Sequence, residues 1–137
     1  MKISTKGRYG LRAMYDLAYH HSDAPIPLKT IAQRQDISEQ YLEQLMLSLR
    51  KAGLIIGIRG ALGGYTLAKA PTDITVGDVL RALEGPIGLV DCALEANATS
   101  CKRSDVCITR PVWEKIRDSV IQTVDSMTLQ DLCENPY

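Results

Sequence analysis

Two short segments with apolar side chains at helical spacing, joined by a brief turn, constrain the fold more than any other feature. Residues 28–35 and 38–53 each place apolar residues at intervals of three and four, as a helix packed on a core does. Ser38 is a favourable N-cap for the second segment, and Gly53 is a natural residue to end it. The pattern predicts a helix-turn-helix motif.

The segment that follows predicts a β-hairpin. Residues 54–58 are rich in isoleucine and leucine, residues 59–64 contain three glycines, and residues 65–68 alternate as a returning strand. A hairpin directly after the second helix of a helix-turn-helix forms the wing of a winged helix. The expected fold class is therefore mainly α with a small β-hairpin wing.

Three further helices are expected around this unit, over residues 4–21, 75–83 and 109–127. The last one has an apolar stripe made of Trp113, Ile116, Val120, Val124 and Met127. A stripe of this length outside the winged unit needs a partner surface, and a second copy of the chain is the simplest one. We therefore expect a long C-terminal dimerisation helix in a homodimer. The alternative is that the stripe folds back onto its own subunit.

The formal net charge of zero conceals a division between the two halves of the chain. Residues 1–70 hold 10 Lys and Arg against 5 Asp and Glu, and residues 71–137 hold 6 against 11. This division is typical of a polyanion-binding unit with an appended segment that does not touch the polyanion. No apolar run approaches the roughly 20 residues that cross a bilayer. The N-terminus also lacks the apolar segment of a signal peptide, so we expect a cytoplasmic protein with no membrane partner.

Polar residues on the second helix and at the wing tip are candidate contacts to double-stranded DNA. A helix in the major groove presents its first two turns to base edges, where glutamine can pair with adenine and glutamate can accept from cytosine. The candidate base-reading residues are Ser38, Glu39, Gln40, Glu43 and Gln44. Lys29 and Arg50 suit phosphates, and Arg59 at the wing tip suits a minor groove. No nucleophile–base pair or phosphate loop suggests an enzyme.

Three cysteines lie close together in a polar segment without a regular period: Cys92, Cys101 and Cys107. Their spacing is too wide for the C-x-x-C pairs of a zinc knuckle. Structural disulfides are disfavoured in a cytoplasmic protein, so the cysteines are expected as thiols, thiolates or ligands. Their grouping predicts a soft metal site or a redox sensor. We accordingly divide the chain into a DNA-binding domain (1–84), a cysteine loop (85–108), and a dimerisation helix with a C-terminal turn (109–137).

These motifs resemble those of the bacterial winged-helix regulators typified by the iron–sulfur cluster regulator IscR, a family that also includes NsrR and CymR. The matching stretches are residues 1–14, 37–44, 49–54, 59–68, 74–79 and 128–132, and the resemblance continues through the cysteine loop. It implies a homodimeric transcription factor whose long helices cross at the dimer interface. By the same resemblance, the helix from Ser38 and the wing at Arg59 contact a palindromic operator.

The resemblance also implies a [2Fe–2S] cluster on Cys92, Cys101 and Cys107. Cluster iron prefers thiolate sulfur, and such a centre needs four protein ligands. IscR-type members complete the set with a histidine three residues after the third cysteine. That position is Arg110 here, and a guanidinium only donates hydrogen bonds and cannot bind iron. NsrR-type members use an aspartate of the partner's first helix, where this chain has Arg8.

The fourth ligand therefore stays open. Candidates are His20, His21, Cys133, Asp91, Glu95, Asp105 or a small molecule from solution. Two other regulators fit the same residues. One is a zinc- or thiol-redox-responsive regulator that uses the cysteines without sulfide, and the other is a CymR-like regulator controlled by a protein partner. Repression and activation fit equally well.

Overall fold

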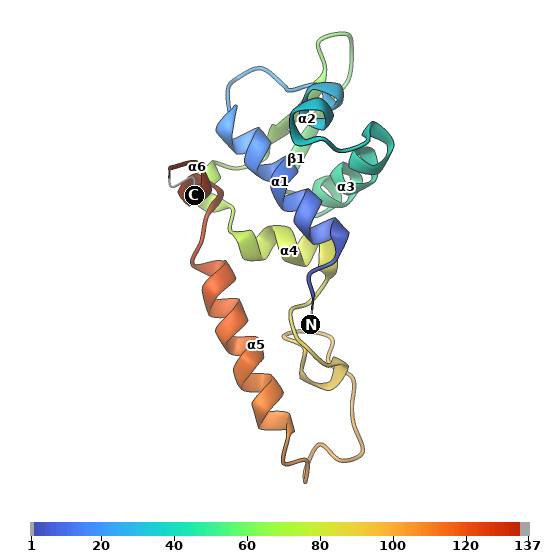
Figure 1. Ribbon diagram of the computed structural model, residues 1–137, viewed down its shortest axis with the longest axis vertical. Helices are drawn as coiled ribbons and strands as arrows, with labels where there is room; N and C mark the ends of the chain where they lie inside the picture. Colours follow the sequence, from blue (N-terminus) through green and yellow to red (C-terminus); the bar gives the residue numbers. More distant parts are fainter. Residues whose placement is uncertain (1, 135–137) are drawn as a thin grey trace.

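The structure is a computed structural model that describes residues 2–134. Its elements are α1 (Thr5–Tyr19), α2 (Leu28–Gln35), α3 (Glu39–Lys51), β1 (Ile55–Ile58), β2 (Gly64–Leu67), η1 (Pro71–Asp73), α4 (Val76–Glu84), η2 (Asp91–Ala93), α5 (Arg110–Asp125) and α6 (Leu129–Glu134). Figure 1 shows a rounded head made of α1 to α4, the hairpin and α6, from which α5 extends as a long arm. This arrangement confirms the predicted class, mainly helical with a two-stranded wing.

The helix-turn-helix forms for the local reasons that its sequence predicts. The Ser38 hydroxyl accepts a hydrogen bond from the Tyr41 N–H at 3.2 Å and so caps α3. Asp36 adopts a left-handed backbone with φ of +53°, which makes the turn after α2 tight. Gly53 has φ of +78° just beyond α3, where a side chain would be strained. The two helices therefore begin and end where these residues require.

The core of the head draws on five helices. Its side chains that are at most 2% exposed include Met14, Leu17, Ile31, Leu42, Leu45, Met46, Leu49, Ile74, Val79 and Leu129. Leu129 belongs to α6, a segment whose sequence predicted only a short turn. Two backbone hydrogen bonds guide the chain back to the head after α5: Val76 N–H to Met127 O at 2.8 Å, and Leu129 N–H to Ile74 O at 2.9 Å. The C-terminal segment thus completes the core of the head.

Asp16 on α1 is a charged residue in the interior of the head. It is only 1% exposed. Arg34 donates to both of its carboxylate oxygens, at 2.9 and 2.6 Å, and Gln35 Nε2 donates at 3.0 Å. A buried carboxylate is tolerated because it is paired and hydrogen-bonded in this way. The contact joins α1 to α2 across 18 residues of sequence.

The wing has an additional backbone pairing, with the segment between α1 and α2, that the sequence does not predict. The hairpin register runs from Ile55 opposite Leu67 to Ile58 opposite Gly64. Ile26, between α1 and α2, exchanges two backbone hydrogen bonds with Tyr65, at 2.9 and 2.8 Å. A Cβ at Gly64 would collide with the Ile26 carbonyl oxygen, so only glycine allows this approach.

In the part of the chain that the structure describes, we find no helix that combines the length and the apolar character required to span a membrane.

Candidate DNA-reading face and cysteine loop

The outer face of α3 presents the predicted base-reading side chains to solvent. Glu39, Gln40, Glu43 and Gln44 are all exposed, while the opposite face of the helix packs into the core. Ser38 is also exposed, but its hydroxyl oxygen already accepts the capping bond. Four of the five candidates are therefore exposed together on one face of α3, whereas the Ser38 hydroxyl caps the helix.

A groove of about 360 Å³ lies between α3 and the wing. Its lining residues are Gln40, Glu43, Gln44, Met46, Leu47, Arg50 and Tyr65. Arg50 crosses from the last turn of α3 toward β1, where its Nη1 would lie 3.7 Å from a Cβ at Gly57. Leu47 is 44% exposed here, and it was not among the DNA-contact candidates predicted from the sequence. An exposed leucine beside polar readers suits apolar contact with a thymine methyl.

Two other predicted DNA contacts lie on separate elements. Lys29 is exposed in the first turn of α2, and Arg59 is exposed at the wing tip. The tip turn depends on Gly60, whose φ is +114° and whose carbonyl accepts from the Gly63 N–H at 3.0 Å. These cations flank the groove and do not line it. This placement suits contacts to phosphates or a minor groove.

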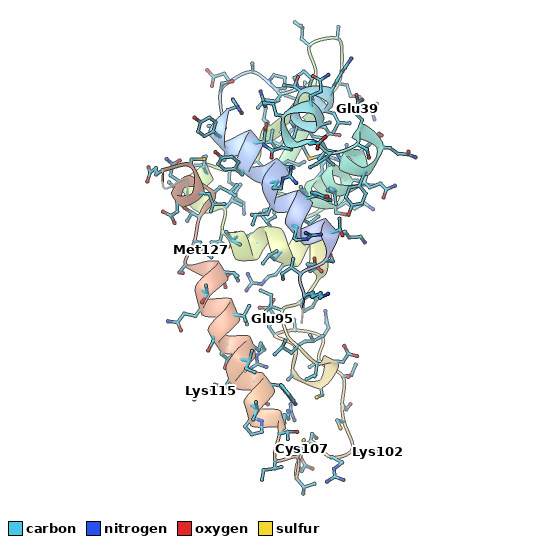
Figure 2. The ribbon with its side chains drawn as sticks, viewed as in Figure 1. Glu39, Glu95, Lys102, Cys107, Lys115 and Met127 are labelled. Carbon is cyan, nitrogen blue, oxygen red and sulfur yellow. The ribbon has the colours of Figure 1, made fainter. Side chains whose placement is uncertain are left out.

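The cysteine loop has a tied half and an exposed half. The tied half, residues 85–95, contains η2 with Cys92. Its two ends are held together by two hydrogen bonds between Glu95 and Ile87, both at 2.9 Å. Residues 96–103 are exposed throughout, including Cys101. Figure 2 shows Lys102 and Cys107 at the end of the molecule opposite to Glu39 on the head. The candidate sensor and the candidate reader thus lie at opposite ends of one subunit.

The Cys107 thiol lies where it ionises easily. Its Sγ is 3.3 Å from the Thr109 hydroxyl. That contact lowers the pKa of Cys107, and the backbone N–H groups of Thr109 and Arg110 at the start of α5 act in the same direction. Cys133 on α6 differs, because burial against the head raises the pKa of its thiol. Of these two cysteines, Cys107 has the chemistry of a ligand or a reactive thiol.

The donor types fit a soft metal or a cluster, but the donors are not yet assembled. Within residues 2–134, no three His, Cys, Asp or Glu side chains are gathered closely enough to hold a metal ion. Cys92 belongs to the tied half of the loop and Cys101 to the exposed half. The Thr99 N–H already donates to the Asp91 carbonyl at 3.0 Å and connects the two halves, so joint ligation requires a further rearrangement of the loop.

The structure also reduces the candidates for a fourth ligand within one subunit. Glu95 uses both carboxylate oxygens on Arg81 and Ile87. Cys133 packs against the core of the head, and His20 and His21 follow the end of α1, which Figure 1 shows far from the loop. Arg110 pairs with Glu114 at 2.9 Å. Asp91 and Asp105 remain exposed beside the cysteines.

The tie at Glu95 predicts a pH response that can be followed at one amide. Arg81 lowers the pKa of Glu95, and the Ile87 N–H adds to this effect. Because the folded-state pKa of Glu95 is lowered, its contacts with Arg81 and Ile87 stabilise the loop fully at pH values above the ordinary glutamate pKa. This stabilisation is lost as the pH falls through the lowered pKa of Glu95. We expect the Ile87 amide resonance to titrate with a midpoint below roughly 4.3. A midpoint at or above that value would contradict the contact. In an Arg81→Gln variant, which keeps Asp125 nearby, the midpoint should rise.

Comparison with known proteins matches nearly the whole chain to regulators of transcription. Residues 3–135 match the model of the Rrf2 family, described as an iron-dependent transcriptional regulator. The regulator CymR of Bacillus subtilis is 49% identical over 132 residues, which cover 96% of this chain and 89% of CymR. The regulator IscR of Pectobacterium atrosepticum is 38% identical over 135 residues, covering 98% and 80%. These relatives are named as regulators of transcription and not as enzymes.

Solved structures agree with this result. The structure of CymR, the global cysteine regulator of B. subtilis, superposes with a TM-score of 0.79 and covers 98% of this chain and 97% of that one. The structure of T. potens IscR is 47% identical, with a TM-score of 0.79 and coverage of 98% and 87%. The likeness to CymR and the likeness to IscR are similar in size, so they do not separate the two kinds of regulator.

Proposed function

The chain belongs to the Rrf2 family of transcriptional regulators, and from that premise we propose that it binds a palindromic operator as a homodimer whose affinity is set by a [2Fe–2S] cluster on its loop cysteines. The observation that carries the proposal is the position of the loop. It holds three thiols in one segment, and its tied half contacts the head through Arg81 with Glu95 and the arm through Arg117 with the Ala93 carbonyl. A change in the loop therefore reaches both parts that determine how a dimer fits DNA.

Homodimerisation is proposed from the open side of α5. Val112 is 49% exposed and Val120 is 37% exposed, although both belong to an apolar face. Ile116, Val120 and Val124 line a shallow apolar depression on the arm. Among the described residues, the main contacts of α5 within the subunit are with α4 and with the loop around η2. A second arm is the simplest cover for this face, because a twofold axis brings identical apolar surfaces together.

The cluster would be held by Cys92, Cys101 and Cys107. It would supply a redox-active iron centre that gathers thiolates. Arg110 occupies the position of the family's histidine ligand and cannot replace it, so we propose that the fourth position is filled by Asp91, Asp105, a residue of the partner subunit or a small molecule. In each case the three cysteines would have to come closer together than they are in the structure, which would order the exposed half of the loop.

Counting iron and acid-labile sulfide in anaerobically prepared protein tests the cluster. We expect two of each per subunit in the wild type, following from the [2Fe–2S] formula. Serine replacements at Cys92, Cys101 or Cys107 should remove the cluster. A Cys133→Ser variant is the matched control and should keep it. A colourless wild-type protein with one tightly held zinc would overturn the cofactor assignment.

A second candidate function follows from the likeness to CymR together with Arg110. In this alternative, the cysteines hold no cluster, and operator binding responds to thiol oxidation or to a partner protein. Regulation that survives serine replacement of all three loop cysteines would favour control by a partner protein. Regulation that is lost, in a protein without iron or sulfide, would favour a thiol switch.

The DNA-reading face makes a separate prediction. A Gln44→Ala variant should lose roughly 1–3 kcal/mol of discrimination at one base pair, because a bidentate contact to adenine is removed. An Arg50→Ala variant should weaken binding to all sequences and reduce the slope of log affinity against log salt by about 1. Fluorescence anisotropy with matched operator variants measures both effects. Gln122→Ala on the arm is the control, and equal binding by all three variants would place the DNA elsewhere.

A further inference from the structure

Any signal from the cysteine loop must travel the length of the subunit to reach the DNA-reading face. Figure 2 shows Cys107 and Glu39 at opposite ends of the molecule, with Glu95 and Met127 between them. The tied half of the loop and α5 both approach the head at α4. The junction of these three segments is therefore where a change in the loop can alter the angle between head and arm.

One side chain connects the three segments. Arg81 extends from α4 and donates from Nε and Nη2 to the two carboxylate oxygens of Glu95, at 2.7 and 3.0 Å. Its Nη1 and Nη2 also donate to the two oxygens of Asp125 at the end of α5, at 2.7 and 2.8 Å. A planar guanidinium can hold two carboxylates in fixed directions in this way, and a lysine cannot. We call these three residues the Arg81 triad.

The surrounding sequence leaves space for the triad. Gly77 lies one helical turn before Arg81, and a Cβ there would collide with the Asp125 carboxylate. Its Cβ would also come within 2.8 Å of Arg81 Nη1. The absence of a side chain at Gly77 thus lets α5 approach α4 closely enough for the salt bridge. Glycine is normally unfavourable inside a helix, and this one lies within the matching stretch 74–79.

The triad is linked to the cysteines through the backbone. Glu95 follows Cys92 by three residues, and Arg117 Nη1 on α5 donates to the carbonyl of Ala93 at 3.4 Å. The Ala93 residue itself is buried at 2% exposure. A movement of Cys92 can therefore reach Glu95 over three residues of backbone.

The arm has a hinge next to the triad. Backbone hydrogen bonds hold Met127 to Val76 and Leu129 to Ile74, so the chain is fixed to the head just beyond α5. Asp125 lies two residues before Met127, and Figure 1 shows the opposite end of α5 far from the head. The contact between Arg81 and Asp125 therefore acts close to the pivot, where a small shift produces a large displacement at the far end of the arm.

We propose that the Arg81 triad transmits the state of the cysteine loop to the angle between head and arm, and that Arg81 is a positioning residue for operator binding. The inference rests on the proposed function and names the means of its regulation. If Cys92 were drawn into a cluster site, Glu95 would be redirected, Arg81 would redistribute between Glu95 and Asp125, and α5 would rotate about its fixed end. In a dimer joined through α5, this rotation changes the spacing of the two reading helices, which an operator requires at roughly 34–36 Å.

The test compares operator affinity in the cluster-loaded and cluster-free forms of the full-length dimer, for the wild type and for Arg81→Gln. Coupling between such sites is typically roughly 5- to 150-fold in affinity. We expect Arg81→Gln to reduce this ratio to about 1, with unchanged iron and sulfide content. Lys69→Gln removes an exposed positive charge from the head, outside the proposed dimer face and the assigned DNA contacts, and is the matched control, which should keep the wild-type ratio. Asp125→Asn, at a 38% exposed side chain, should also lose the ratio and guards against misfolding of the first variant.

The outcomes separate the inference from the proposed function. A wild-type ratio that persists in both Arg81→Gln and Asp125→Asn overturns the role of the triad and leaves cluster regulation intact. A wild-type protein that loads a cluster but binds the operator equally in both forms overturns the regulation itself, and the triad's role with it. Loss of the ratio in both variants, with thermal unfolding near that of the control, supports the inference, because a purely structural role would lower stability without abolishing the ratio.

Discussion

Replacement of Val120 by aspartate is expected to leave each subunit folded but monomeric, and to weaken operator binding by roughly 10²–10⁴-fold. Val120 is 37% exposed on the open side of α5, so a carboxylate there remains solvated in the isolated subunit. In the proposed dimer the same carboxylate would be buried against its own copy without a cation. The affinity falls because two half-sites are then bound independently and not by one bivalent molecule.

Sedimentation of the variant, together with its operator affinity, measures this effect. Gln122→Asp introduces the same charge two residues further along α5, where the side chain is exposed and points to a different side of the helix. It should remain dimeric and bind DNA as the wild type does. A Val120→Asp protein that is still dimeric would show that the two arms do not meet through this face.

Replacement of Arg34 by alanine is expected to lower the free energy of unfolding by about 3 kcal/mol, because it leaves a buried carboxylate without its cation. Asp16 is 1% exposed, and after the replacement its only remaining side-chain partner in the structure is Gln35. The Arg34 side chain itself is 33% exposed, so little packing is lost with it. The effect therefore comes from the uncompensated charge and not from a cavity.

Urea unfolding of the apo protein measures the change. Gln33→Ala alters the exposed neighbouring residue on α2 and should change stability by less than about 0.5 kcal/mol. We expect a loss of unfolding free energy at the low end of the range for broken buried ion pairs, because Gln35 still donates to Asp16 at 3.0 Å. A change below about 1 kcal/mol for Arg34→Ala, similar to that of an exposed pair, would contradict the burial of this contact.

The predictable part of the fold is the part that local signals specify. The Ser38 cap, the Gly53 helix end and the glycine-rich wing turn each depend on residues within a few positions, so they can be found from sequence. The contacts that were missed join distant segments. Asp16 with Arg34 and Ile26 with Tyr65 leave no periodic pattern, because their partners are set by how the helices pack.

The candidate site divides in the same way. The exposed face of α3 follows from helical periodicity, so Gln40, Glu43 and Gln44 were identified from sequence and are exposed in the structure. Leu47 was missed because exposure of an apolar residue depends on the wing beside it. The Arg81 triad was also missed, and Glu95 was instead a candidate iron ligand. Arg81, Glu95 and Asp125 are far apart in the sequence, and their contact depends on how the loop and α5 pack against α4.

The most direct measurement is the affinity of the anaerobic wild-type dimer for its operator at one fixed salt concentration, taken before and after removal of the cluster, with iron and sulfide counted in the same samples. We predict about two iron and two sulfide per subunit in the loaded form, and an affinity that differs from the cluster-free form by roughly 5- to 150-fold. Equal affinities in the two forms, or a protein that takes up neither iron nor sulfide, would contradict the proposal that the loop cysteines regulate DNA binding through a cluster.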